Sequence, residues 1–218
     1  NCSPYGLPGQ IANINLAVTI LGTSGTCGVA NQFKGLASLP DSAKFDFKPF
    51  WVRSMYCATA AMSIAKAADR GEVGDAYTAG LQHEIGRLAF ASAIPDAYAR
   101  VSPEMPDEQR VEAERALFGI THSEAGFMMA SKWKLPSSIS ETIKRHHDEQ
   151  ETRDTGELVA IVRVAAAMAD AYVREATLGD CTARCRDALK HLLMDGATLT
   201  RIYDKTADTI DGISRQRS

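Results

Sequence analysis

An imidazole and a carboxylate stand side by side in one stretch of small and apolar residues. These are His83 and Glu84, within residues 79–88. Consecutive side chains on a helix point roughly 100° apart, so the pair reaches one ion only where a cleft opens at that corner of the helix. A hydrogen-bonded core histidine beside a solvent-facing Glu84 explains the same pattern. Both interpretations stay open at this level.

Four further residues carry side chains that bind metals or move protons, namely His122, His146, His147 and Asp170. Neutral imidazoles and carboxylates suit Zn, Fe, Mn or Ni at roughly 2.0 to 2.2 Å, and a mixed set holds up to two such ions. A bound metal lowers the pKa of water toward about 7 and so supplies hydroxide for phosphoester cleavage. Convergence of these residues on one cavity is a hypothesis.

Each of these residues also has a simpler explanation. His146 and His147 close an expected helix, where the helix dipole favours positive charge by roughly 0.3 to 1 kcal/mol. His122 fits the first turn of a capped helix. Asp170 has two arginines at helical spacing, so an ordinary ion pair is an equal alternative to a metal bond. The two arginines are Arg163 and Arg174.

Composition indicates one sizeable core. The chain has 218 residues, 45% of them hydrophobic, and a net charge of −3 with basic and acidic residues interspersed. No basic stripe points to nucleic acid, and no apolar run approaches the roughly 20 residues that span a bilayer. No leader of the secretory kind is seen. We therefore expect a cytoplasmic protein without nucleic-acid or membrane partners, and reduced, partly buried cysteines, since the five show no disulfide spacing.

Helical periodicity accounts for nearly all of the chain. A short helix is expected to end at Gly22 and a second to cover residues 23–37. Pro49 favours the start of a long helix that reaches Asp69, and His83 falls inside a helix over residues 75–91. A turn follows Pro95, and the remaining expected helices cover residues 104–118, 122–133, 136–147, 158–178, 181–194 and 197–210.

Local features place some of these elements. Residues 121–124 form a capping box that puts His122 at the first helical position. The helix over residues 104–118 is charged with a narrow apolar edge, which predicts a surface position. Trp51 and Trp133 are expected in the core. No stretch alternates as a strand does, so the fold class is all-α.

The order and gaps of several motifs resemble the HDOD domain, the HD-related output domain of bacterial signalling proteins. The matching segments are residues 1–7 followed by Ile14 and 17–22, Phe50-Trp51 with Ser54, 79–88, 117–120 with His122, Glu124 and Gly126, Trp133 with 135–136, 146–147 and 165–172. The resemblance implies an HD-domain-like bundle of helices related to the HD and HD-GYP phosphohydrolases. It implies an HDOD domain over residues 1–178 and a C-terminal helical extension over 179–218. The chain opens on Asn1, and the family usually has a further helical segment ahead of this motif, so we expect residues upstream.

In the related phosphohydrolases the matching positions bind metal, which implies the ligand set His83, Glu84, His122, His146, His147 and Asp170. Arg53 departs from this pattern, because it stands where the enzymes have their first histidine ligand. Pro49, one turn earlier, stands where some have an acidic ligand. A guanidinium repels cations, so we expect Arg53 to fill the pocket beside His83 and to pair with Glu84 or Asp170.

Two smaller departures from the family pattern also disfavour a complete metal site. Glu84 is one methylene longer than the aspartate usual in the family, and residues 148–151 replace the Gly-Tyr-Pro element. The site is thus expected to be degenerate.

These departures favour a non-catalytic signal-transduction module that acts through protein–protein contacts. The expected partners are receiver, diguanylate cyclase or phosphodiesterase domains, and a second copy of the chain is a candidate as well. The alternative is a metal-dependent phosphohydrolase for a cyclic dinucleotide or nucleotide, with His83 and Glu84 as catalytic candidates. A third hypothesis is a sensor that binds a metal or small ligand without turnover. No resident cofactor is expected in the first case, whereas Fe, Mn, Zn or Ni fits the other two.

Overall fold

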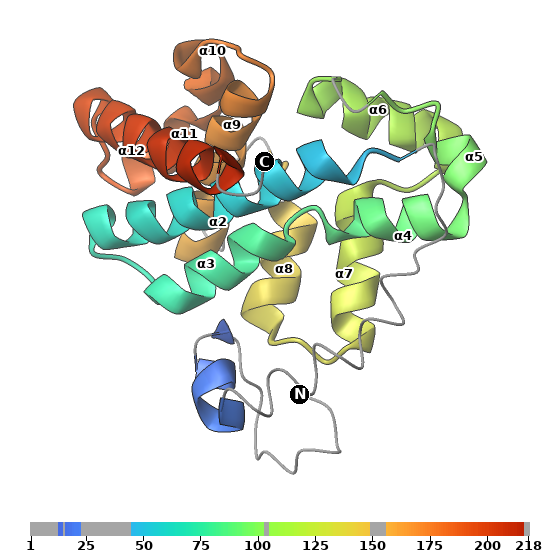
Figure 1. Ribbon diagram of the computed structural model, residues 1–218, viewed down its shortest axis with the longest axis horizontal. Helices are drawn as coiled ribbons and strands as arrows, with labels where there is room; N and C mark the ends of the chain where they lie inside the picture. The colour runs from blue at the N-terminus through green and yellow to red at the C-terminus, as the bar shows by residue number, and fades with distance from the viewer. Residues whose placement is uncertain (1–12, 15, 23–44, 103–104, 149–155, 216–218) are drawn as a thin grey trace.

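The computed structural model describes residues 13–14, 16–22, 45–102, 105–148 and 156–215, without the side chains of Cys181 and Ser214. Within these ranges the regular elements are all helices, which confirms the all-α prediction (Figure 1). Residues 16–22 are helical and Gly22 has a φ of +66°, in agreement with the expected stop. The motif over residues 1–7 and the helix expected over 23–37 lie outside the described ranges.

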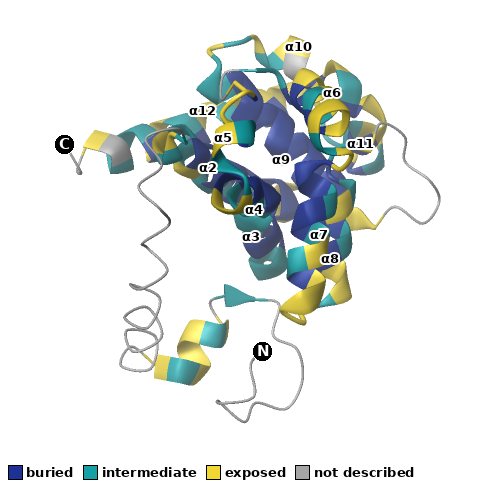
Figure 2. Ribbon diagram, turned by 90° about the vertical axis from the view of Figure 1, so that its right-hand side faces the viewer, coloured by how far each residue is buried: buried dark blue, intermediate teal, exposed yellow. Residues whose placement is uncertain are grey.

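Helix α2 (Phe47–Ala68) packs against α3 (Val73–Gln82) and α9 (Glu157–Val173). It begins two residues before Pro49, because the Asp46 carboxylate caps it by accepting from the backbone N–H of Lys48 at 2.9 Å. Helix α9 is buried along nearly its whole length (Figure 2). It ends at Val173 and not near residue 178, since Glu175 takes a left-handed φ of +53°.

The helix expected over residues 75–91 is in fact two helices, α3 and α4 (Ile85–Ala93). His83 and Glu84 lie at the junction, where the backbone of Glu84 leaves the helical region with ψ of 15°. The break has a packing cause, because α3 rests on α2 and α9 whereas α4 rests on α7 (His122–Lys132). A Cβ on Gly86 would overlap backbone atoms of His122 and Gly126, so α4 touches the start of α7.

The middle of the chain follows the predicted order. The short α5 (Pro95–Tyr98) follows Pro95, and α6 (Asp107–Phe118) leads into α7 and α8 (Ser137–Arg145). The capping box of α7 is present, with Thr121 Oγ1 accepting from the Glu124 N–H and the Glu124 carboxylate accepting from the Thr121 N–H.

The C-terminal region is more broken than expected. In place of one helix over residues 181–194 there are α10 (Leu178–Thr182), the 3₁₀ turn η2 (Ala183–Cys185) and α11 (Arg186–His191). Helix α12 (Gly196–Arg215) then runs beyond the predicted end at residue 210 and lies along α2 (Figure 1).

The main core joins α2, α3, α8, α9, α11 and α12, and a smaller cluster gathers around Phe90 and Tyr98. Cys57 and Cys185 are buried thiols, as predicted. The prediction for the tryptophans is wrong, because Trp51 is 51% and Trp133 48% exposed. Phe50 takes the buried position beside Trp51, and Trp133 caps the end of α7. Among the described residues no helix is long and apolar enough to span a membrane.

Candidate functional site

The predicted site residues gather where the α3–α4 junction meets α2, α9 and the facing ends of α7 and α8. They form two groups. One group holds imidazoles, with candidate ligand atoms of His122, His146 and His147 within 4.8 Å of one another. The other holds carboxylates, in which Glu84 and Asp170 are joined through Arg53. His83 lies between them, with its ring centroid 5.1 Å from that of His146.

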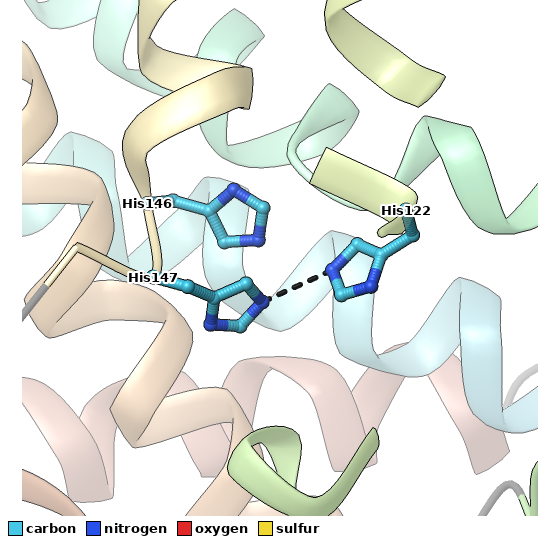
Figure 3. A group of neighbouring side chains, drawn as sticks. All are labelled: His122, His146 and His147. Atoms are coloured by element: carbon cyan, nitrogen blue, oxygen red, sulfur yellow. Dashed lines mark hydrogen bonds between the residues drawn. The ribbon is translucent and has the colours of Figure 1, made fainter. Parts of the chain in front are cut away.

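In the imidazole group, ring nitrogens converge from two helix ends (Figure 3). His122, at the start of α7, has its Nε2 3.0 Å from Nε2 of His147, which follows α8. The rings of His146 and His147 lie 4.0 Å apart between centroids. The capping box at Thr121 fixes where α7 begins and thereby fixes the direction of the His122 side chain.

Hydrogen bonds at Nδ1 orient three of these rings. His122 Nδ1 donates to Glu114 Oε2 at 2.7 Å, and His146 Nδ1 donates to the Ile143 carbonyl at 2.7 Å. His83 Nδ1 donates to the Gly80 carbonyl at 2.8 Å. An acceptor at Nδ1 places the proton there and leaves the Nε2 lone pair available as a ligand. The Nε2 atoms of His83 and His146 are buried and have no hydrogen-bond partner in the described part of the chain.

Burial favours the neutral form of three imidazoles, those of His83, His146 and His147. Burial lowers the pKa of His83 to about 4. Burial, together with the neighbouring His122, lowers the pKa of His147 to about 3, and burial holds the pKa of His146 well below its usual value. At neutral pH these three rings are therefore uncharged, which is the state that binds metal ions.

In the carboxylate group, one guanidinium lies among three acids. Arg53 Nε is 3.0 Å from Glu84 Oε1, and Arg53 Nη1 is 3.0 Å from Asp170 Oδ1. Its Nη2 pairs with Asp107. The geometry expected from the sequence is thus confirmed for both predicted partners. Burial opposes the charge of Arg53, but the three carboxylates outweigh it and raise its pKa above the usual value.

Two more arginines complete this cluster. Arg87 Nη1 contacts Glu84 Oε2 at 2.9 Å, and Arg110 Nη1 contacts Asp107 Oδ1 at 2.5 Å and Glu84 Oε1 at 3.4 Å. Burial raises the pKa of Glu84, yet the surrounding arginines hold it well below its usual value. Glu84 is 1% exposed, so the interpretation with a solvent-facing carboxylate is wrong.

The second carboxylate oxygen of Asp170 also forms ion pairs with arginines. Asp170 Oδ2 lies 2.9 Å from Arg174 Nη1 and 3.6 Å from Arg184 Nη2. The ion pair with Arg174 that helical spacing indicated is therefore present.

The two groups differ in their fit to a metal ion. His83 and His146 have buried Nε2 atoms without a hydrogen-bond partner in the described part of the chain, and the cluster of His122, His146 and His147 is a nitrogen donor set that suits zinc and its neighbours in the periodic table. The oxygens of Glu84 and Asp170 are paired with guanidinium groups, so that part does not fit a second ion. The six residues of the predicted set therefore come together, but as two chemically distinct halves.

Sequence reasoning missed the contribution of α6. The helix was predicted to lie on the surface, yet its charged residues Asp107, Arg110 and Glu114 are the buried ones, whereas Leu117 is 37% exposed. Their spacing of three and four residues marks one face of a helix. That signal does not separate a buried charged face from a solvated one.

Two cavities open beside the imidazoles. One, of about 330 Å³, is lined by His146, His147, Asp107 and Arg163, among others. The other, of about 400 Å³, reaches His147 from the side of Thr121. His147 borders both cavities and is therefore the imidazole with the most direct access to solvent.

Known proteins resemble the chain at the level of sequence and fold. A protein of Treponema pallidum (strain Nichols), described only as uncharacterized, is 26% identical over 152 residues, which are 68% of this chain and 29% of that protein. The chain thus spans less than a third of that relative. The MmoQ response regulator of Methylococcus capsulatus is 23% identical, with a TM-score of 0.66 over 92% of this chain and 79% of that one. A structure from Shewanella amazonensis SB2B, provisionally named a phosphohydrolase, is 22% identical, with a TM-score of 0.58 over 75% of this chain and 60% of that one.

A family model, the HDOD domain, matches residues 1–149. That match covers more than half of the chain and includes all the predicted site residues except Asp170. The chain belongs to the HDOD domain family.

Proposed function

We propose that this chain is a non-catalytic signal-transduction module that acts through contacts with partner proteins. Membership of the HDOD family supports a role related to signalling, and the fold is shared with a response regulator. The observation that carries the proposal is the position of Arg53 among Glu84, Asp107 and Asp170.

The charge count supports a pocket that works without a pair of ions. Five guanidinium groups lie within ion-pair distance of the buried carboxylates Glu84, Asp107 and Asp170, so these carboxylates carry no uncompensated negative charge: Arg53, Arg87, Arg110, Arg174 and Arg184. A divalent ion added at the carboxylates would face guanidinium groups a few ångströms away in a region of low dielectric, where like charges repel strongly. Arg53 thus takes the place that a cation would need.

The imidazole group is the observation that favours the alternative, a metal-dependent phosphohydrolase. In that case a metal would supply hydroxide, and the histidines would hold it. Glu84 has no free oxygen for this chemistry, because each of its oxygens is paired with an arginine. The two functions predict different results in one assay.

The assay measures phosphoester turnover by the purified chain with Mn²⁺, Fe²⁺, Zn²⁺ or Ni²⁺. The substrates are cyclic di-GMP, a mononucleotide diester and bis-p-nitrophenyl phosphate, and His83→Ala is the control variant. We expect the same rate for both proteins, at the level of metal alone. Metal-dependent turnover that His83→Ala abolishes would refute the proposal.

The partners belong to this proposal too. Receiver, diguanylate cyclase and phosphodiesterase domains are the candidates, and a second copy of the chain is a further one. Calorimetric titration with purified domains of each class, and sedimentation equilibrium of the chain alone, test them. Binding to one class supports the proposal, and turnover without binding to any of them contradicts it.

A further inference from the structure

We infer that Glu114, which lies outside the ligand set that the family resemblance implies, positions His122 for a single transition-metal ion held by His122, His146 and His147 without carboxylate ligands. This inference rests on the proposed division of the pocket, in which Arg53 holds the carboxylates.

The three nitrogens already lie close to the spacing that an ion needs. Two nitrogens on a tetrahedral zinc ion, each about 2.0 to 2.1 Å from the metal, are roughly 3.4 Å apart. His122 Nε2 and His147 Nε2 are 3.0 Å apart, and all three ligand atoms lie within 4.8 Å. Binding of one ion by all three requires the rings to rotate about their side-chain bonds until each pair of nitrogens is roughly 3.4 Å apart.

The hydrogen bond between His122 and His147 has a defined direction. Because the Nδ1 proton of His122 goes to Glu114, its Nε2 is an acceptor, and the Nε2 of His147 must donate the proton between them. An ion that binds here replaces this proton, and the proton leaves with solvent. His147 borders both cavities, which gives the ion and the proton a route.

Glu114 is buried, and its carboxylate contacts His122. Its Oε2 accepts from both the backbone N–H and Nδ1 of His122, each at 2.7 Å. Its Oε1 accepts from the Tyr98 hydroxyl at 3.0 Å, and that hydroxyl accepts from Arg87 Nε at 3.2 Å. Glu114 and His122 are both fully buried. A carboxylate on the far nitrogen of a ligating histidine fixes the tautomer and raises the basicity of the ligand, and its removal costs 10 to 100-fold in affinity.

The test titrates the full chain, cleared of metal, with Co²⁺, following its visible absorption, and measures Zn²⁺ per chain by elemental analysis. We expect one ion per chain, and no visible cobalt band in His146→Ala or His147→Asn. Glu114→Gln should bind cobalt about 10 to 100-fold more weakly and reach the same spectrum at saturation. Glu112→Gln, which alters an exposed carboxylate on α6, the helix that carries Glu114, should leave the affinity unchanged.

A second measurement separates positioning from a loss of fold. Nitrogen NMR of the metal-free protein should show His122 protonated at Nδ1 only, and Glu114→Gln should give a mixture of tautomers while its backbone spectrum stays dispersed. Two ions per chain, no ion at all, or equal affinity in Glu114→Gln would overturn the inference. Because these measurements do not involve turnover, they can fail while the proposed non-catalytic function stands, and the phosphoester assay can fail while they succeed.

Discussion

At the centre of the molecule, the guanidinium of Arg53 lies within ion-pair distance of Glu84, Asp107 and Asp170 and is 2% exposed. Burial of charges on this scale is costly unless each charge has a partner. Loss of one member leaves its partners as buried charges without compensation. The resulting loss of stability exceeds the net stabilisation that the ion pair itself provides.

Replacement of Arg53 by methionine should lower the free energy of unfolding by about 3 to 5 kcal/mol, because the carboxylates then remain buried without their shared cation. Urea unfolding at pH 7 measures this. The matched control is Arg70→Met, which removes an exposed pair with Glu157 and should change stability by less than about 1 kcal/mol. Equal effects of the two variants would mean that the central cluster contributes no more than a surface ion pair.

The buried histidines predict a loss of stability in acid. The pKa of His83 is about 4 in the folded protein, below its ordinary value of 6.5. The unfolded chain therefore binds more protons, so stability is fully present above about pH 6.5 and falls as the pH drops toward 4. The contribution of His83 is roughly 1.4 kcal/mol per pH unit in this window.

Urea unfolding between pH 8 and pH 4 measures this dependence, with His83→Gln as the comparison. The variant should show a shallower fall over the same window. A profile that is flat between pH 6.5 and 4.5 in the natural sequence would contradict the neutral, buried state of this ring.

At the level of elements, the contact of α4 with α7 places His83 and Glu84 beside the start of α7. A Cβ on Gly86 would overlap the carbonyl of His122 and lie 2.6 Å from the backbone nitrogen of Gly126. The two helices can approach this closely only because neither has a side chain at the crossing. The site thus depends on glycines that carry no chemistry.

Gly86→Ala should destabilise the protein by about 1 to 3 kcal/mol or more, since the backbone must shift to admit the methyl group. Gly212→Ala on α12 has nothing within 4 Å of the new Cβ and should be neutral or stabilising by up to about 1 kcal/mol. Thermal unfolding of both variants measures the difference. Similar midpoints for the two would show that α4 and α7 are not in close contact.

At the level of the whole molecule, α12 binds back onto the helix that carries Arg53. Its residues Leu199, Ile202 and Ile210 join the main core, and the Tyr56 hydroxyl on α2 donates to the Tyr203 carbonyl at 3.0 Å. Tyr56 and Tyr172 stack with their ring centroids 4.6 Å apart. This packing favours a C-terminal extension that unfolds together with the rest of the chain.

Ile210→Ala should lower the free energy of unfolding by about 2 to 5 kcal/mol and keep a single transition, because the side chain is 2% exposed. Asp208→Ala, at an exposed position two residues earlier, should stay within about 0.5 kcal/mol of the natural sequence. Circular dichroism and tryptophan fluorescence should report the same midpoint. A separate early transition in Ile210→Ala would mean that α12 unfolds independently.

Much of this molecule follows from local sequence rules. Caps and glycines fix several helix ends, including the capping box at Thr121 and the stop at Gly22, because these depend on atoms within one turn. The ordered motifs point to the family. The positive charge of Arg53, at a position where the related enzymes have a metal ligand, predicts ion pairs with the acidic residues of the site. These conclusions needed no knowledge of what packs against what.

Other features depend on contacts between distant segments. Periodicity shows which residues share a face but not what that face meets, so the charged side of α6 was assigned to solvent although it is buried against Arg53 and His122. The break at His83 and the exposure of Trp51 arise for the same reason, since helices that run on in sequence rest on different partners in space. The sequence by itself identified the residue types that can bind a metal ion. Tertiary packing decided that the carboxylates of Glu84 and Asp170 lie beside Arg53, whereas the imidazoles of His122, His146 and His147 lie beside one another.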